Sequence, residues 1–169
     1  SLAYQNSKGN EIVSTNNVTA LSRASASSNW YDRAFPLEQV SLQVFSAWTD
    51  SFSTEFKYGQ KSSEGLQLPL QGAEFAEMQV ATSQGGTVYL GPDEFRHANA
   101  LSNDLDQIKF KAQYVRGLHT LKAGVEAERL DIFNLFVPRS QGQYIFSSIA
   151  NFQNRTATSL NYQNAVTNE

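Results

Sequence analysis

Apolar and polar residues alternate regularly along positions 104–131 of this chain. Every second residue from 108 to 114 is apolar, and after a break at Arg116-Gly117 every second residue from 121 to 127 is apolar as well. A period of two is typical of β-strands, whose side chains point alternately to the two faces of a sheet. The pattern therefore predicts a β-hairpin with one apolar and one polar face.

A two-residue turn at Arg116-Gly117 sets the expected register of this hairpin. It places Phe110 beside Ala123, so the apolar rows of both strands share one face. On the other face, Lys109 then lies diagonal to Glu126, within reach for charge pairing.

A second hairpin of the same design is predicted over residues 37–61. Its apolar residues fall mainly on even positions of both strands. Because the two rows have the same parity, an odd-length loop is needed to align them, and Asp50-Ser51-Phe52 supplies one. The expected register then pairs Val44 with Tyr58.

Hairpins of this length fit two environments. In a soluble sandwich the apolar row faces a protein core, whereas in an outer-membrane barrel it faces lipid and the polar row faces a wet lumen. Each strand alternates over about ten residues, the length that a tilted strand needs to cross a bilayer, whereas ordinary strands have about five or six. Trp48, Phe52 and Tyr114, next to the two tight turns, match the aromatic girdle of such barrels. The pattern favours lipid, with the soluble sandwich as the alternative.

Long segments lead away from the other ends of the strands, an asymmetry typical of barrels. Phe75–Ala81 and Thr87–Leu90 are expected to pair across a Gly-rich turn, and Gly91-Pro92-Asp93-Glu94 resembles a helix start. One or two helical turns are also expected within Tyr144–Phe152. Residues 1–36 carry little regular pattern, and Ser14–Asn29 within them indicates an exposed loop.

Composition excludes several classes of function. The formal net charge is -3 and the sequence pI is near 5.4, so no nucleic-acid partner is expected. The chain has no cysteine, which excludes disulfides and thiolate metal sites. No apolar run approaches the length of a membrane-spanning helix, so a membrane role would require strands.

The sequence offers little catalytic chemistry. His97 and His119 are the only histidines, and neither has a second ligand at a recognisable spacing, so no metal or other cofactor is predicted. Asp93 and Glu94 fit the first turn of a helix better than a cation site. No serine lies in a nucleophile elbow, and Gly85-Gly86 indicates a turn rather than a phosphate loop. We therefore expect the protein not to be an enzyme.

Several stretches, taken in order, resemble the barrel region of TonB-dependent outer-membrane receptors, the Oar-like branch in particular. They are residues 28–31 (SNWY), 46–55 (SAWTDSFSTE), 85–99 (GGTVYLGPDEFRHAN), 117–126 (GLHTLKAGVE) and 133–136 (FNLF). The order and spacing of these stretches carry the resemblance, because each motif alone is common in barrels.

The resemblance implies a barrel of about 22 strands with an N-terminal plug, energised through TonB. Such a receptor takes up a scarce nutrient, of the siderophore, carbohydrate or peptide class, across the bacterial outer membrane. The implied partners are membrane lipid and lipopolysaccharide, the rest of the barrel and its plug, and the TonB system through an N-terminal part missing here. Because four long strands cannot close a barrel and Ser1-Leu2-Ala3-Tyr4 lacks signal-peptide features, we expect an internal segment of the barrel.

The expected fold class is all-β, with antiparallel long-strand hairpins from a transmembrane β-barrel and long surface loops carrying a small hairpin and a short helix. The whole chain would belong to one barrel domain. Its parts are a strand end and loop (1–36), a hairpin (37–61), a long outer loop (62–103), a second hairpin (104–131) and another outer loop (132–169).

The polar face of the two hairpins holds the candidate functional residues. The candidates that would face the lumen are Glu55, Lys57, Lys109, Lys111, Glu126 and Glu128. One interpretation is a hydrated wall of paired charges, and the other is that some of these residues contact a plug or a passing substrate. Trp30, Tyr31 and Tyr89, in the outer loops, could touch a ligand or pack the loops together.

The alternative function is a soluble secreted β-domain that binds carbohydrate or another protein. It predicts that Val44, Phe110 and Val125 are buried against other residues of this chain.

Overall fold

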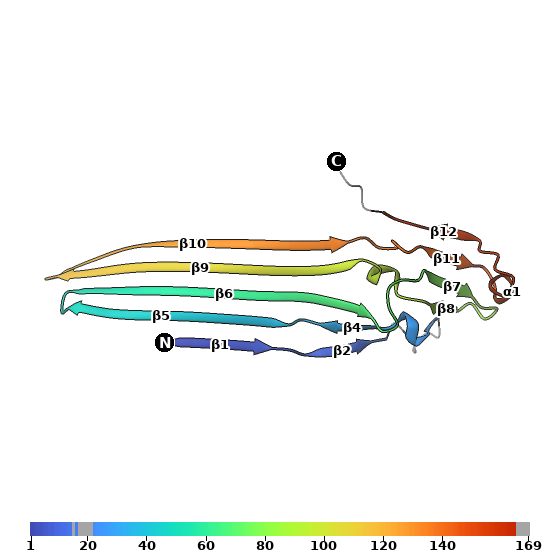
Figure 1. Cartoon of the computed structure of the whole chain (residues 1–169), viewed down its shortest axis with the longest axis horizontal. Coiled ribbons are helices and arrows are strands. Elements are labelled where there is room, and N and C mark those ends of the chain that lie inside the picture. Colours follow the sequence, from blue (N-terminus) through green and yellow to red (C-terminus); the bar gives the residue numbers. More distant parts are fainter. Residues whose placement is uncertain (15, 17–21, 165–169) are drawn as a thin grey trace. The chain divides into compact units, whose positions relative to one another are not determined.

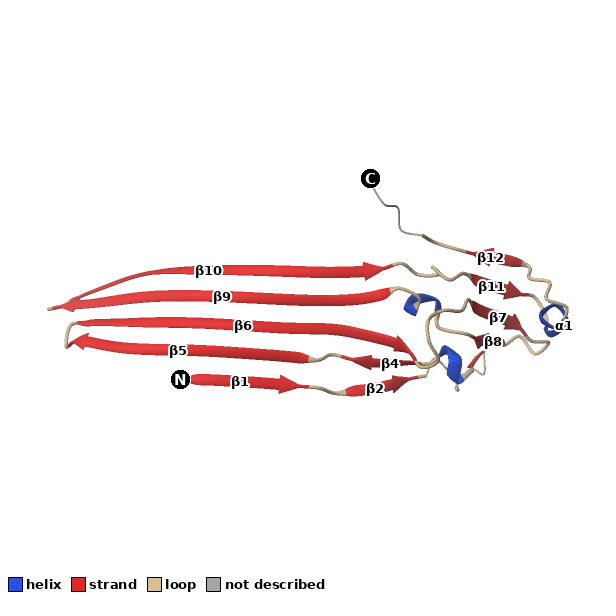
Figure 2. Cartoon of the chain, in the orientation of Figure 1, coloured by secondary structure: helices blue, strands red, loops and turns tan. Residues whose placement is uncertain are grey.

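The computed structural model of the chain describes residues 1–14, 16 and 22–164. Strands dominate these residues, with only short helical turns (Figure 2). This confirms an all-β fold with long antiparallel hairpins, a small hairpin and a short helix. In chain order the elements are β1 (Leu2–Ser7), β2 (Asn10–Val13), β3 (Arg23–Ser25), η1 (Ser27–Asn29), β4 (Tyr31–Ala34), β5 (Leu37–Thr49), β6 (Phe52–Pro69), β7 (Glu77–Ala81), β8 (Thr87–Leu90), η2 (Glu94–Arg96), β9 (Asn99–Arg116), β10 (His119–Phe136), β11 (Gln143–Phe146), α1 (Ile149–Gln153) and β12 (Ser159–Asn161).

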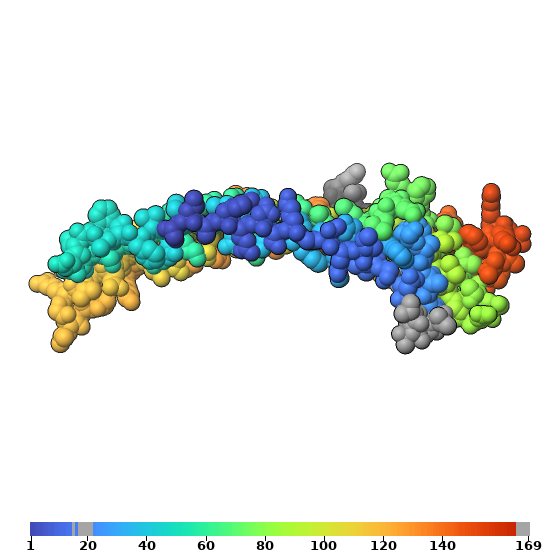
Figure 3. Space-filling view, turned by 90° about the horizontal axis from the view of Figure 1, so that it is seen from below, coloured from blue at the N-terminus to red at the C-terminus, as the bar shows by residue number. Residues whose placement is uncertain are grey.

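Contacts divide the chain into two units, of which the first contains the long hairpins. This unit comprises Ser1–Lys8, Phe35–Glu64 and Ser102–Phe133. Its strands follow the order β1-β5-β6-β9-β10, and the four long strands lie side by side (Figure 1). Strand β1 forms one open edge and is uncovered in the edge-on view (Figure 3).

The β5–β6 hairpin has a different register from the expected one. Its turn is Asp50-Ser51, and a register irregularity leaves Trp48 without a partner in the ladder. Val44 consequently pairs with Phe56 instead of Tyr58. The bulge at Trp48 absorbs the extra residue that a three-residue loop would have supplied. Because the register moved by two residues, every side chain keeps its predicted face.

The β9–β10 hairpin also turns one residue later than expected, at Gly117-Leu118. Gly117 has a φ of 58°, a left-handed conformation that glycine adopts easily and arginine does not. The expected turn would have placed Arg116 at that position. Counting back from the observed turn brings Lys109 directly opposite Glu126, and the faces are again preserved.

The long strands extend beyond the alternating segments. β6, β9 and β10 each have 18 residues, so parts of the predicted outer loops at 62–69, 99–103 and 132–136 are strand. The alternation ends earlier than the strands because the outer ends carry polar residues on both faces, or apolar residues such as Leu130 and Ile132 on the otherwise polar one. Pattern alone therefore placed the strand ends too early.

The second unit comprises Gly9–Ala34, Gly65–Leu101 and Asn134–Glu169. Here β4 pairs with β2 and with the end of β6, and a separate five-stranded sheet has the order β12-β11-β7-β8-β3. The β7–β8 hairpin confirms the pairing expected across the Gly-rich turn. By contrast, β11 pairs with β7 and β3 with β8 in parallel, between segments far apart in sequence.

The remaining expectations were met in part. The helix expected from Gly91 is only the three-residue turn η2, because β9 begins at Asn99. Within Tyr144–Phe152, α1 supplies the expected helical turn while Tyr144 belongs to β11. The described part of residues 1–36 holds four short strands. The first, β1, agrees with the strand end expected there, whereas the sequence pattern does not predict β2, β3 and β4, which pair with segments outside their own neighbourhood. In the expected loop 14–29, positions 15 and 17–21 lie outside the described residues, and Asn29 is buried.

The hydrophobic core lies in the second unit. Among the described residues, the buried hydrophobic side chains are Tyr31, Val80 and Phe146. Phe152 of α1 packs on this core, with its ring edge-on to that of Phe146 and the two ring centroids 5.3 Å apart. Within the described residues, no helix has the length and apolar character needed to span a bilayer.

Candidate functional site

The first unit exposes its apolar face. All of its residues are described, and none is buried. Val44 is 44% exposed, Phe110 43% and Val125 67%. The burial that the soluble-domain alternative predicts for these three side chains is therefore not observed.

Aromatic side chains mark both ends of this exposed apolar band. Near the turns, Trp48 donates its Nε1–H to Thr54 Oγ1 at 2.9 Å, and Phe52 and Tyr114 lie close to the same level of the strands. At the other end, Tyr4 and Tyr58 direct their hydroxyls to carboxylates just beyond the band.

Tyr4 Oη lies 3.2 Å from Glu38 Oε1, and Tyr58 Oη lies 3.4 Å from Asp106 Oδ1. Only the aromatic row near the turns was predicted from the sequence. The second row, Tyr4 and Tyr58, was detectable in the sequence. Each tyrosine lies on the apolar face at the level where the residues on neighbouring strands change from apolar to acidic. From Val40 to Trp48 the band covers roughly 27 Å along β5, or about 20 Å across a bilayer at a usual strand tilt.

The opposite face brings most of the predicted site residues together. Lys109 Nζ lies 2.6 Å from Glu126 Oε2, and Gln107 donates to Glu126 at 3.0 Å and to Glu128 at 2.5 Å. Glu55 lies 3.6 Å from Lys111 Nζ across β6 and β9. These contacts confirm the expected charge pairing on this face.

Two further contacts complete this face. Gln43 Nε2 donates to Glu55 Oε1 at 2.8 Å, so that carboxylate has partners on both neighbouring strands. Lys57 makes no ion pair with any described residue. The predicted site residues thus form two separate groups. Glu55 pairs with Lys111, and Gln107 connects the Lys109–Glu126 pair to Glu128, while Lys57 belongs to neither group.

A groove of about 790 Å³ lies over these groups, within the first unit. Its lining includes Phe45, Glu55, Lys109, Lys111 and Lys122. Phe45 is 67% exposed although its neighbours on this face are polar. Phe45 and Lys122 are not among the predicted site residues, although their strand parity already places them on the polar face.

Gly124 forms part of the groove lining for a steric reason. A Cβ at this position would lie 2.7 Å from the carbonyl oxygen of Phe110 and 3.1 Å from Lys111 Cγ. Only glycine therefore allows β9 and β10 to approach this closely here.

The second unit contains a buried polar cluster that sequence analysis did not predict. Glu77 is 1% exposed, and its Oε1 accepts from Gln79 at 2.8 Å and from Gln143 at 2.9 Å. Its Oε2 accepts from Asn29 Nδ2 at 3.0 Å and from the backbone N–H of Glu94 at 3.1 Å. A detectable signal was the alternation of polar Glu77 and Gln79 with apolar neighbours in a short strand.

Asp93 lies beside this cluster at the start of η2. Burial raises the pKa of Asp93, opposed by the hydrogen bond from the Phe95 N–H at 3.1 Å and by the charges of Arg96 and Arg23. Arg23 Nη2 is 3.8 Å from Asp93 Oδ2. The carboxylate thus has protein partners on two sides.

The aromatic residues proposed as possible ligand contacts pack within the second unit. Tyr31 is 6% exposed and lies under the Arg96 guanidinium, and Tyr89 lies under that of Arg23 at 3.7 Å. Trp30 donates its indole N–H to Ser25 Oγ at 3.0 Å. These contacts pack the second unit, with Tyr31 in β4 and Tyr89 in β8 and not in loops.

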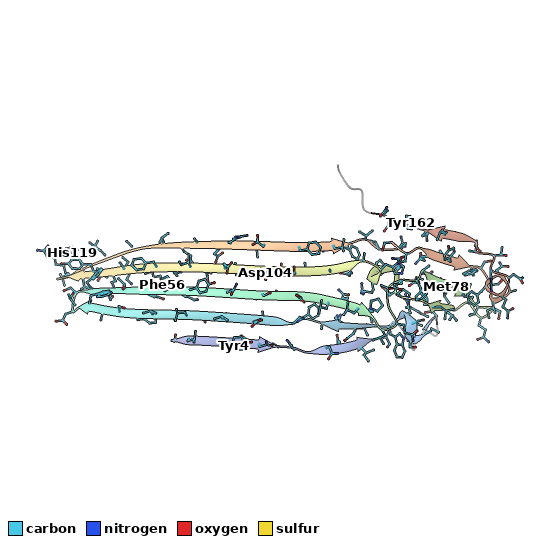
Figure 4. The ribbon with its side chains drawn as sticks, in the orientation of Figure 1. Tyr4, Phe56, Met78, Asp104, His119 and Tyr162 are labelled. Carbon is cyan, nitrogen blue, oxygen red and sulfur yellow. The ribbon has the colours of Figure 1, made fainter. Side chains whose placement is uncertain are left out.

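The two histidines occupy different environments. His97 is buried, with Nδ1 accepting the Gln141 backbone N–H at 3.3 Å and Nε2 donating to the Pro92 carbonyl at 3.2 Å. His119 is exposed at the turn of the β9–β10 hairpin (Figure 4). Glu94 pairs with Arg139. Among the described residues, no group of three or more acidic or histidine side chains has a geometry that could hold a metal ion.

Comparisons of the chain with models of protein families, with curated proteins and with solved structures gave no match. The functional proposal therefore depends on the exposed apolar band, the charged opposite face and the sequence motifs.

Proposed function

We propose that this chain is a segment of a TonB-dependent outer-membrane receptor that takes up a scarce nutrient across the bacterial outer membrane. The observation that carries the proposal is the first unit, which exposes an apolar band between two aromatic rows on one face and a charged, ion-paired face on the other. Lipid on one side and water on the other satisfy both faces at once.

The apolar band would be costly in water. Among the residues of the band, Val44, Phe110 and Val125 are each more than two-fifths exposed, and no element of the first unit covers them. Contiguous apolar patches of this kind usually contact lipid or another protein. The phenol and indole groups at its two ends are typical of the bilayer interfaces, where an aromatic ring has one apolar and one wet side.

The charged face requires water. Lys109, Lys111 and Glu126 are hydrogen-bonded or ion-paired but incompletely shielded, and such groups are strongly disfavoured next to hydrocarbon. A water-filled lumen provides the solvent they need. Because open strand edges do not occur in lipid, β1 and β10 would pair with further strands of a longer barrel.

The length of the strands supports a large receptor. A strand of 18 residues is about 60 Å long, whereas the hydrocarbon core is about 30 Å thick. At a usual tilt, the strands extend beyond the apolar band on the side away from the tight turns. There they would form a wall above the membrane surface.

Cell fractionation tests the proposal directly. Antibodies raised against the chain are used to follow the natural protein through separation of the soluble, inner-membrane and outer-membrane fractions of its bacterium. We expect it in the outer-membrane fraction, resistant to alkaline carbonate and released by detergent. Recovery of the protein in the aqueous fraction would remove the receptor proposal and leave the alternative of a soluble secreted β-domain that binds carbohydrate or another protein.

A further inference from the structure

Charges in the first unit are sorted by face. The polar face carries five lysines and three glutamates, an excess of two positive charges, although the whole chain has a formal charge of -3. These residues are Lys57, Lys61, Lys109, Lys111, Lys122, Glu55, Glu126 and Glu128. On the other face, the residues just beyond the apolar band are mainly acidic, including Glu38, Asp106 and Asp131.

The carboxylates near the groove already have partners. Glu55 contacts Lys111 and Gln43, and Glu126 contacts Lys109 and Gln107. Ammonium groups therefore remain available. Within the described residues Lys122 forms no ion pair, and the side chain of Lys111 is 54% exposed despite its 3.6 Å contact with Glu55.

The groove also has the size and composition of a small-molecule site. Its volume of about 790 Å³ falls within the usual range for ligand pockets, roughly 300–1,000 Å³. Phe45 and Ala47 add an apolar surface beside Lys111 and Lys122. A ligand that fits this lining has an anionic group for the two lysines and a flat apolar part for the phenyl ring.

We propose that this groove binds a small anionic solute, a carboxylate or phosphate that also carries an apolar or aromatic part. The inference rests on the proposed function, because a solute reaches this face in the membrane only if the face lines a water-filled channel. Lys111 and Lys122 bind the anionic group, and Phe45 contacts the apolar part. The lysines at the groove thus give the transported nutrient a charge preference.

Nuclear magnetic resonance of the full chain in detergent micelles tests this proposal with three matched probes. They are phenyl phosphate, neutral benzyl alcohol and cationic benzylamine. We expect phenyl phosphate at millimolar concentration to shift the backbone amides of Ala123 and Gly124 in a saturable way, and the other two probes to leave them unchanged. Binding should weaken as salt rises, because screening shortens the reach of the lysine charges from about 10 Å at 0.1 M to about 3 Å at 1 M.

Variants separate the two parts of the site. The double variant Lys111→Gln/Lys122→Gln should bind phenyl phosphate at least tenfold more weakly. Lys61→Gln, which removes a charge from the same face outside the groove, should bind it normally. Phe45→Ser should weaken binding of phenyl phosphate while leaving inorganic phosphate unaffected.

Three results would overturn the inference. They are equal shifts with the neutral or cationic probe, no saturable shift with phenyl phosphate, and unchanged affinity in the double lysine variant. These outcomes are independent of cell fractionation. An outer-membrane protein whose groove ignores anions refutes only this inference. An aqueous protein that binds phenyl phosphate refutes the receptor, and with it the role in transport, and leaves only the anion site.

Discussion

Val125→Arg gives the most direct physical test of what touches the apolar face. Val125 lies in the apolar row of β10 between Leu121 and Ala127, and is 67% exposed. It is four residues from Leu121, the end of that row nearest the tight turn. This separation is about 13 Å along the strand, or about 10 Å along the bilayer normal at a usual strand tilt. The side chain therefore lies near the middle of the apolar band.

The two interpretations predict different costs for this substitution. If the face contacts lipid, arginine near the bilayer midplane should lower the free energy of unfolding from the membrane by about 2–4 kcal/mol. If the face contacts water, Val125 is a surface residue, and the change should be within about 0.5 kcal/mol. Because two-thirds of this side chain is exposed, loss of packing within the chain adds little to either value.

The assay is equilibrium urea unfolding of the chain inserted in phosphatidylcholine vesicles, followed by tryptophan fluorescence. Gln113→Arg is the matched control, because it places the same charge on the polar face of the neighbouring strand β9. We expect a large loss for Val125→Arg and almost none for Gln113→Arg. Equal free energies for the two variants would refute the assignment of the apolar face to lipid.

Three further predictions concern the second unit. Glu77→Ala leaves four donors without their acceptor and should lower the free energy of unfolding by about 4 kcal/mol or more, measured as faster amide hydrogen exchange in β7 and β11. The control Gln79→Ala removes one donor and should lower it much less. Gly91→Ala should destabilise the unit by more than about 1–2 kcal/mol in thermal unfolding, because Gly91 has a φ of 77° and a Cβ there would also collide with the Ala76 carbonyl. The control Gly85→Ala has a similar φ of 79° but open space around the Cβ, so it carries only the conformational cost. Asp93→Asn should change the pH dependence of stability: burial raises the pKa of Asp93 above the ordinary 3.8, so its stabilising contribution is present at low pH and is lost as pH rises through that pKa.

Each of these predictions has a result that contradicts it. Unchanged exchange in Glu77→Ala would mean that the buried cluster does not hold the small sheet together. Equal stabilities of the two alanine variants would show that the Ala76 carbonyl yields without cost. For Asp93→Asn, the free energy of unfolding of the wild type relative to the variant should fall as pH rises above 3.8, and a rise would contradict the sign derived from burial.

The alternating pattern predicted the faces of the long hairpins correctly but not their registers. Both turns moved, one because of the bulge at Trp48 and the other because Gly117 supplies the positive φ. Neither effect is visible in a period of two. Since each register changed by two residues, the candidate lysines and glutamates stayed on one face, and the pairing of Lys109 with Glu126 was predictable.

The second unit was much less predictable. The β7–β8 hairpin is local and carries a clear turn signal, so the sequence was sufficient for it. The parallel pairing of β11 with β7 joins residues more than sixty positions apart, and no short pattern encodes such a contact. Glu77 gave a weak signal, because its partners Asn29 in η1 and Gln143 in β11 are distant in sequence. Burial of a carboxylate can be recognised only once those segments are brought together.

The reach of Glu77 along the chain has a consequence for the order of folding. The long hairpins close between neighbouring segments and can form early, because short loops cost little entropy to close. The small sheet must wait for Gln143, whose amide supplies one of the four donors to Glu77. A folding chain whose β11 has not yet paired with β7 therefore holds Glu77 short of one hydrogen-bond donor, and we expect the small sheet to gain its protection against amide exchange after the long hairpins.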